Sequence, residues 1–351
     1  MSAFIVVGGQ WGDEGKGLIS AFLSVREKAA YICRAGTGSN AEHGIYLQDK
    51  KTYLKTNQLP LGWIFSKDSQ IRIGSGVAVN PDLLLQEIGK YKLNDRVLID
   101  YRCPIISKEH IASEQNSKSM QGIGSTFSGT GYCRSDFVLR KAKQARDIEV
   151  LKPYITDVTA EINKLSSDSS IIIESSQGTF LSLAVSSDYP NTTSDNVTTN
   201  AALDDVGLNW KKLSGVILVV KALPTREGAG GFGNAIDITH RIEGTDLAET
   251  SSIQNAMRRK ADSIDFALLR YAVEINGATE IALTFCDHYD KTITDCTEKY
   301  SITKQIRELI NNIEKTTDTP VTILNTGKSY ASVIDLVGDT KIPNIDKWYA
   351  V

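Results

Sequence analysis

The chain has 351 residues, of which 41% are hydrophobic and 23% are charged, and its net charge is −3. This composition is typical of a globular protein, and the charge gives no indication of a nucleic-acid partner. No apolar run reaches the roughly 18 residues that a transmembrane helix requires, and the N-terminal residues lack the charged region of a signal peptide.

The cysteines and histidines argue against a zinc site. The five cysteines are scattered without a C-x-x-C pair, and no two of the four histidines lie at metal-ligand spacing. An odd number of scattered cysteines favours free thiols in a reducing compartment, so we expect a cytoplasmic protein that contacts neither membrane nor nucleic acid.

The most informative stretch is residues 5–17, where a β-branched run leads through five glycines into a helix-like run at 18–24. A strand, a glycine-rich turn and a helix start are typical of a phosphate-binding loop. The spacing is not that of a P-loop, because Gln10 and Gly17 stand where glycine and serine or threonine are required. Asp13 inside the loop points to Mg²⁺ binding or to proton removal from a substrate. The alternative is a tight structural turn.

The rest of the chain alternates between strand-like and helix-like stretches. We expect strands at residues 30–34, 97–100, 171–174, 216–220, 280–284 and 321–324, and a strand with a turn at 71–79. We expect helices at residues 83–90, 150–165, 263–274 and 302–313, with basic residues on a helical stretch at 134–146 and a basic cluster, 257–260, at the start of the third helix. The alternation predicts a single α/β domain over 1–351 around a mostly parallel sheet, with an inserted helical segment around 101–165.

Several of the expected strands run into a loop rich in glycine or polar residues. These loops are residues 36–44, 175–179, 225–233 and 325–328, and further polar loops lie at 122–131 and 186–200. In an open α/β sheet, ligands bind at the carboxyl ends of the strands. The sequence therefore predicts a nucleotide-binding crevice at that edge.

Residues 9–17 resemble the signature of the adenylosuccinate synthetases, and weaker matches extend the resemblance over nearly the whole chain. The further matches are Asn40-Ala41-x-His43, Gln177-Gly178, Tyr189-Pro190 with Thr193, Thr225-Arg226, Arg259, Asp287 and Thr326-Gly327. The resemblance implies a P-loop-NTPase-related α/β fold. It also implies a ligase that joins L-aspartate to IMP with GTP and Mg²⁺.

The resemblance further implies catalytic roles. Asp13 would remove the purine N1 proton, so that O6 attacks the γ-phosphate, and His43 would stabilise the phosphoryl group during transfer. Lys16 would add positive charge at the triphosphate, and Gln177 would contact the edge of the base. Asp13 and the backbone carbonyl of Glu42 would hold Mg²⁺.

The remaining implied site residues fall into three groups. The nucleoside triphosphate would contact Gly12, Glu14, Gly15, Lys16, Gly17, Asp287, Asn325, Thr326 and Gly327. The purine mononucleotide would contact Asp13, Ser39, Asn40, Ser125, Thr126, Arg140, Gln177, Thr193, Glu227 and Met257, with Arg140 reaching in from a second subunit of a homodimer. Arg258 and Arg259 would bind aspartate.

Five positions depart from the family pattern. Met257 replaces an arginine that serves the aspartate carboxylate and the ribose 2′-OH, and Glu227 replaces a valine near the ribose. Glu42 replaces a glycine, Ser39 a histidine, and Phe285 the lysine that flanks the donor guanine. Loss of a 2′-OH partner makes a deoxyribose acceptable.

These departures resemble a bacteriophage branch of the family, the N6-succino-2-amino-2′-deoxyadenylate synthases. Those enzymes use dGMP in place of IMP on the way to 2-aminoadenine DNA. The sequence therefore predicts dGMP as acceptor and ATP, dATP or GTP as donor, with ordinary IMP chemistry as the alternative.

Two other classes of function fit the sequence less well. A P-loop-like kinase would need the Walker spacing, which is absent. A nucleotide-binding module without catalysis would not need Asp13, Lys16, His43 and Gln177 together.

Overall fold

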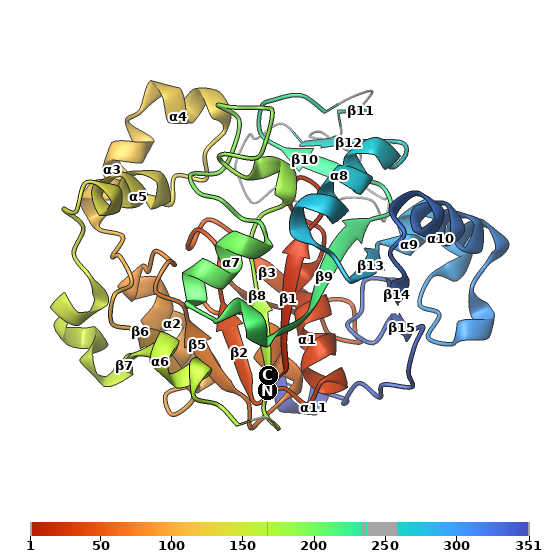
Figure 1. The fold of residues 1–351 in the computed structure, drawn as a ribbon, viewed down its shortest axis with the longest axis horizontal. Coiled ribbons are helices and arrows are strands. Elements are labelled where there is room, and N and C mark those ends of the chain that lie inside the picture. The colour runs from red at the N-terminus through yellow and green to blue at the C-terminus, as the bar shows by residue number, and fades with distance from the viewer. Residues whose placement is uncertain (1, 167, 233–235, 238–257, 350–351) are drawn as a thin grey trace.

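The computed structural model describes residues 2–166, 168–232, 236–237 and 258–349. Its centre is a sheet in which ten strands are described, in the order β15-β14-β13-β9-β1-β8-β2-β5-β6-β7 (Figure 1). All neighbouring strands pair in parallel except β14 and β15, which are antiparallel. The predicted α/β fold with a mostly parallel sheet is confirmed.

The strands of this sheet are β1 (Ser2–Gly8), β2 (Tyr31–Arg34), β5 (Gln70–Ile73), β6 (Val97–Asp100), β7 (Ile155–Thr156), β8 (Ser170–Glu174), β9 (Leu213–Lys221), β13 (Glu280–Thr284), β14 (Val321–Asn325) and β15 (Val333–Asp335). Two small antiparallel sheets accompany it, one of β3 (His43–Tyr46) and β4 (Tyr53–Thr56), the other of β10 (Thr225–Glu227), β12 (Arg258–Lys260) and β11 (Ile236–Asp237).

The described α-helices are α1 (Lys16–Arg26), α2 (Pro81–Tyr91), α3 (Lys108–Gln115), α4 (Lys118–Ile123), α5 (Thr130–Val138), α6 (Val158–Asn163), α7 (Thr199–Val206), α8 (Phe266–Asn276), α9 (Cys286–Tyr289), α10 (Lys304–Thr317) and α11 (Asp346–Tyr349). The described 3₁₀ turns are η1 (Gly62–Phe65), η2 (Ala145–Asp147), η3 (Glu149–Tyr154), η4 (Thr179–Leu181), η5 (Trp210–Lys212), η6 (Lys291–Ile293) and η7 (Lys299–Ser301). No helix in these parts of the chain is long and apolar enough to span a bilayer.

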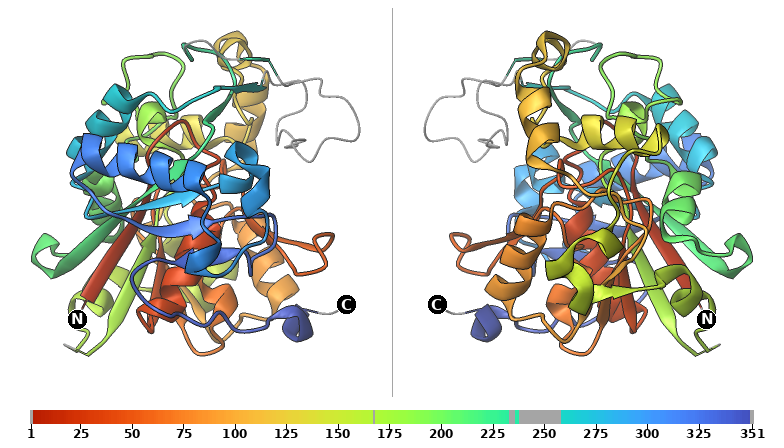
Figure 2. Two further views of the ribbon diagram at one scale, coloured as in Figure 1. Left: turned by 90° about the vertical axis from the view of Figure 1, so that its right-hand side faces the viewer. Right: turned by 90° about the vertical axis from the view of Figure 1, so that its left-hand side faces the viewer.

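The core lies on both faces of the sheet (Figure 2). On β1, Val6 packs with α1 and α2 on one face, whereas Ile5 and Val7 pack with α7, α8 and α10 on the other. Side chains alternate along a strand, so a strand covered on both sides reads as a continuous apolar run. This is why the β-branched runs predicted the central strands well.

The structure corrects the expected helix at 150–165. The segment instead forms η3, the short strand β7 and the helix α6, which begins only at Val158. Pro153 lies within η3. Proline lacks the backbone N–H and clashes with the preceding turn, so a continuous α-helix cannot pass through this position.

Two further expectations are wrong in detail. Helix α5 ends at Val138, so Arg140 lies beyond it with φ 62°. Arg258–Lys260 form β12, paired with β10, and the following helix begins at Phe266. In both cases tertiary pairing or a turn replaced the regular structure that local composition favoured. The strand with a turn expected at 71–79 is confirmed, because β5 ends at Ile73 and the chain then turns past Asp205.

Candidate active site

A cavity of about 1640 Å³ lies at the carboxyl ends of the parallel strands. Loops that follow β1, β8, β9, β13 and β14 reach it, and segments from α4 and α5 contribute to its wall. Figure 1 shows α3, α4 and α5 grouped beyond this edge of the sheet. The predicted crevice is therefore present at the expected edge.

The loop after β1 is held by a buried carboxylate as well as by its glycines. Glu14 accepts hydrogen bonds from the backbone N–H groups of Gln10 (3.1 Å) and Gly12 (2.9 Å). Its other oxygen pairs with the Lys16 ammonium at 2.6 Å. The Gln10 side chain both donates to and accepts from the Lys221 backbone, which ties the loop to β9. Glu14 thus organises the loop from within.

The same loop delivers an anion-binding helix start. Gly12, Asp13 and Gly15 all have positive φ, and α1 begins at Lys16 without an acidic residue in its first turn. The N-terminal N–H groups and the helix dipole favour a bound phosphate. Asp13 is exposed and lines the cavity.

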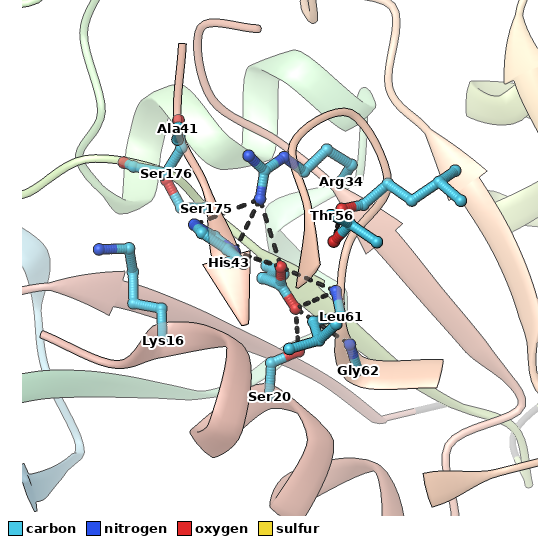
Figure 3. Close-up of polar contacts among 12 residues, drawn as sticks. Lys16, Ser20, Arg34, Ala41, His43, Thr56, Leu61, Gly62, Ser175 and Ser176 are labelled. Carbon is cyan, nitrogen blue, oxygen red and sulfur yellow. Dashed lines mark hydrogen bonds and ion pairs between the residues drawn. The ribbon is translucent and has the colours of Figure 1, made fainter. Parts of the chain in front are cut away.

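His43, on β3, lies in the cavity wall in contact with a buried ion pair (Figure 3). Its Nδ1 is 2.5 Å from Glu174 Oε1 and 2.9 Å from Arg34 Nη1. Burial and the neighbouring Arg34 lower the pKa of His43 to about 4, although Glu174 opposes this. The ring is therefore neutral at pH 7.

Hydroxyl and amide groups line a further part of the cavity. Asn40 donates to the Thr193 hydroxyl at 3.2 Å and accepts from Thr37 at 2.6 Å. Ser125 and Thr126 line the same cavity in the loop before α5. Such donors can surround a monophosphate.

A second region of the cavity follows β13 and β14. Asp287 lines it, and its Oδ1 is buried with no hydrogen-bond partner in the described chain. Burial raises the pKa of this carboxyl. Asn325 accepts from the backbone N–H of Phe285 at 3.1 Å and donates to Gly327 at 2.8 Å, so its amide shapes the loop. An unpaired carboxylate oxygen of this kind suits a ligand with N–H donors.

Most of the predicted site residues converge on the cavity. Those that line it are Gly12, Asp13, Glu14, Gly15, Lys16, Gly17, Asn40, Glu42, His43, Ser125, Thr126, Gln177, Thr193, Glu227, Asp287, Asn325 and Gly327. Met257 and the side chain of Arg258 lie outside the described residues.

Four predicted residues do not line it. Ser39 is buried beneath the loop, and the buried Thr326 donates its hydroxyl to Cys296 O at 2.6 Å. Arg259 donates to the backbone carbonyls of Gly228 (2.8 Å) and Gly230 (2.6 Å). Arg140 is exposed beyond α5, as a residue directed at a second subunit would be.

Sequence reasoning missed the supporting roles of Glu174 and Arg34, and it named Arg226 only as part of a family match. Arg226 is buried, pairs with Asp188 and donates to Asn191 O at 2.8 Å, so it joins the 186–200 loop to the cavity rim. Glu174 and Arg34 were treated only as strand ends. A charged residue that ends a fully apolar strand was the signal available, because a buried charge requires a partner.

The Asp13 carboxylate and the backbone carbonyl of Glu42 fit a hard cation. Asp13 and Glu42 both line the cavity, and Glu42 pairs with Lys55 at 2.6 Å. Within the described ranges no three His, Cys, Asp or Glu residues gather as a metal site. Mg²⁺ commonly takes one or two protein oxygens and completes its shell with water and phosphate, so this donor set suits it.

The adenylosuccinate synthetase family model matches residues 5–150 and 142–292. An adenylosuccinate synthetase from Pyrococcus horikoshii is 39% identical over 340 residues, covering 95% of this chain and 98% of that relative. The chain belongs to the adenylosuccinate synthetase family. Another adenylosuccinate synthetase, from Methanocaldococcus jannaschii, is 39% identical over 341 residues, covering 96% of this chain and 97% of the relative.

Two solved structures share the fold. The adenylosuccinate synthetase of Plasmodium falciparum matches with a TM-score of 0.82 at 23% identity, over 95% of this chain and 99% of that one. The succinoaminodeoxyadenylate synthetase of cyanophage S-2L, bound to dGMP and dATP, matches with a TM-score of 0.76 at 23% identity, over 99% and 98%. As a member of the adenylosuccinate synthetase family, the protein is a carbon–nitrogen ligase.

Proposed function

We propose that this ligase condenses L-aspartate with dGMP, using a nucleoside triphosphate and a 6-phosphoryl intermediate, to form the 2-amino-N6-succinyl deoxyadenylate. The observation that supports this acceptor most directly is Glu227, whose position lines the cavity where the family has an apolar residue. A carboxylate there can accept hydrogen bonds from the 2-amino group that guanine has and hypoxanthine lacks. The loss of the arginine at 257 removes a 2′-OH partner.

The reaction then divides between the groups already described. Asp13 takes the N1 proton, O6 attacks the γ-phosphorus, and the nucleoside diphosphate leaves. The aspartate amine next attacks C6 and expels phosphate, while Gln177 holds the edge of the base. Lys16 and the start of α1 stabilise the phosphates, with His43 at the transferring group.

Mg²⁺ is the cofactor of this proposal. Asp13 and the backbone carbonyl of Glu42 are the groups that would hold it. When bound, the cation neutralises charge on the phosphate oxygens.

IMP is the second candidate acceptor. The relatives at 36–39% identity are adenylosuccinate synthetases, and Asp13, which their reaction requires in the proposed mechanism, is retained. Under this alternative Glu227 would serve the sugar rather than the base.

Two features of the donor region favour different nucleotides. Asp287 offers a carboxylate, which matches the N1–H and 2-amino donors of guanine. Phe285 offers an aromatic ring in place of lysine, and stacking on an aromatic ring accepts any base. The donor is therefore tested among GTP, ATP and dATP.

The deciding experiment varies the base of the acceptor, which is hypoxanthine or guanine, and its sugar, which is ribose or deoxyribose. The protein is given aspartate, Mg²⁺ and each donor with IMP, dIMP, GMP or dGMP, and phosphate release and the succinylated product are measured. We expect turnover of dGMP well above the other three. Exclusive turnover of IMP would overturn the dGMP proposal, and turnover of none would overturn the ligase assignment of the site.

Replacing Glu227 identifies its partner. Glu227→Val should lower kcat/KM for dGMP about 10- to 100-fold, because one charged hydrogen bond to the base is worth roughly 1.5–3 kcal/mol. It should leave the rate with dIMP within about twofold, since that base has no 2-amino group. An equal loss with both acceptors would place Glu227 at the sugar.

A further inference from the structure

The contact between His43 and Glu174 joins residues that are 131 positions apart in the sequence. His43 comes from β3 at the edge of the cavity, and Glu174 ends β8 in the middle of the central sheet. Glu174 is completely buried, and His43 is 7% exposed. The carboxylate therefore lies behind the imidazole, on the side away from the cavity.

The two oxygens of Glu174 have different partners. Oε2 accepts from the Ser20 hydroxyl (2.5 Å) and the backbone N–H groups of Leu61 (2.8 Å) and Gly62 (3.1 Å). Oε1 meets His43 Nδ1 at 2.5 Å and Arg34 Nη1 at 3.2 Å, and the Leu61 N–H is within 2.9 Å as well. One oxygen thus anchors α1 and η1, whereas the other is turned toward the functional side chain.

The donor or acceptor character of Arg34 and Glu174 determines which ring nitrogen of His43 carries the proton. Arg34 can only donate, and the ionised carboxylate can only accept. Burial alone would raise the pKa of Glu174, but His43, Arg34 and Ser20 together hold it at about 2, so the carboxylate is ionised at neutral pH. Nδ1 is closer to this acceptor (2.5 Å) than to Arg34 Nη1 (2.9 Å), and the same Nη1 lies 3.4 Å from Nε2. The Nδ1 proton therefore points to Glu174, and Arg34 can donate on the Nε2 side of the ring.

We propose that Glu174 is a positioning residue for His43, which holds the proton on Nδ1 and presents Nε2 to the transferring phosphoryl group. Figure 3 shows Arg34, Ser20, Leu61 and Gly62 converging on the carboxylate that contacts His43. A carboxylate hydrogen-bonded to one ring nitrogen fixes the tautomer and orientation and raises the basicity of the other nitrogen. The inference rests on the role proposed above for His43.

Glu174→Gln tests the positioning role with little change of shape. Ser20 and the backbone N–H groups of Leu61 and Gly62 donate to Oε2, whereas Oε1 faces one of those N–H groups and the side chains of Arg34 and His43, which can move. The amide oxygen should therefore stay at the Oε2 position and the amide NH₂ should face His43. That group donates to Nδ1 and should reverse the tautomer. We expect kcat to fall about 100-fold, with the nucleotide KM changed less than about threefold. Glu174→Asp keeps the negative charge but moves it away from His43. Its kcat should therefore lie between that of the wild type and that of Glu174→Gln.

Nuclear magnetic resonance gives a measurement that does not depend on turnover. The chain has four histidines, so the imidazole ¹⁵N spectrum is simple, and His43→Gln assigns the relevant signals. We expect Nδ1–H for His43 in the wild type and Nε2–H in Glu174→Gln. A wild-type Nε2–H tautomer, or full kcat in Glu174→Gln, would overturn the proposal.

Ser20→Ala is the matched control. It removes a hydrogen bond to Oε2 but leaves the Oε1–His43 contact. It should lower the midpoint of urea unfolding while kcat stays within about twofold. A loss of kcat equal to that of Glu174→Gln would show that Glu174 acts only through stability. If no acceptor were turned over, the proposed function would fail, but the spectrum would still test the tautomer of His43. Failure of the proposed function and failure of the positioning role are therefore distinguishable.

Discussion

At the scale of single residues, buried carboxylates hold the loops and side chains of this site in place. Glu14 orders the first loop, and Glu174 stands behind His43. Neither role follows from residue type, because a glutamate in a polar loop and one at a strand end are ordinarily solvated. Each is stabilised by several donors at once, which is what a buried charge requires.

Asp205 is a third buried carboxylate, and it predicts a pH-dependent stability. Burial, with Asp195 nearby, raises its pKa from 3.8 to about 7, although Gly36 donates a 2.8 Å hydrogen bond to it. Between about pH 4 and pH 7 the folded chain keeps a proton that the unfolded chain has released. This contribution to the free energy of unfolding is present below pH 4 and is lost as pH rises to 7, on the order of 4 kcal/mol.

Asp205→Asn removes that titration. Relative to the wild type, we expect the variant to gain stability progressively from pH 5 to pH 8, as measured by urea unfolding at each pH. Asp204→Asn, at the exposed neighbouring position on α7, serves as the control and should shift stability little. A pH-independent difference between Asp205→Asn and the wild type would contradict the expected direction of the pKa.

At the scale of elements, short pieces set the shape of the cavity rim. The segment expected to be one helix at 150–165 is divided by Pro153 and by pairing of β7 with β6. By contrast, α2 and α10 form where their patterns predicted them. Asn80 caps α2 by accepting from the Leu83 N–H at 3.2 Å, followed by Pro81 at the first helical position. A segment with a strong local signal, such as a helix cap, forms the predicted helix, whereas a segment with only a weak helical pattern can pair in a sheet instead.

Two glycines on helices should respond oppositely to alanine. Gly89 lies within α2 with nothing within 4 Å of an added Cβ, so Gly89→Ala should stabilise the protein by about 0.5–1 kcal/mol. Gly207 ends α7 with φ 66°, and a Cβ there would lie 2.3 Å from Thr159 Oγ1. Gly207→Ala should therefore destabilise by more than about 1 kcal/mol. Denaturant midpoints measure both, and a gain at Gly207 would contradict the steric reading.

At the scale of the whole molecule, we expect the proposed site to include a residue from a second subunit. Arg140 is exposed and follows Val138 and Leu139, whose side chains are 69% and 57% exposed at the end of α5. Exposed apolar residues beside a cavity wall suit an interface between copies of the chain. We predict a homodimer in which Arg140 completes the neighbouring site.

Mixed dimers test this arrangement. Arg140→Ala and Asp13→Asn should each be inactive alone, but a 1:1 mixture that exchanges subunits should regain about one quarter of the wild-type rate. Half of the dimers in this mixture contain one chain of each variant, and each such dimer has one intact site out of two. A mixture of Asp13→Asn with His43→Gln is the control and should stay inactive, because both residues come from the same chain. Equal activity of the two mixtures would rule out a shared site.

The sequence by itself determined the α/β class, the position of the phosphate loop and the family. These depend on local properties: β-branched runs that are buried on both faces, and glycines that turn a strand into a helix. The loop at residues 8–17 could be predicted from these local properties because the loop, its strand and its helix are contiguous in the sequence. Most residues of the candidate site could be named because the family resemblance implied them.

Only the tertiary structure decided which of those residues face the cavity and what supports them. Asn325 and Gly327 line it, whereas Thr326 between them turns inward, and Arg259 holds the backbone of the 228–230 turn. Glu174 meets His43 because β8 lies between β1 and β2, an order that no local pattern encodes. Pairing across a sheet depends on which strands become neighbours, and that is determined by packing of the whole chain.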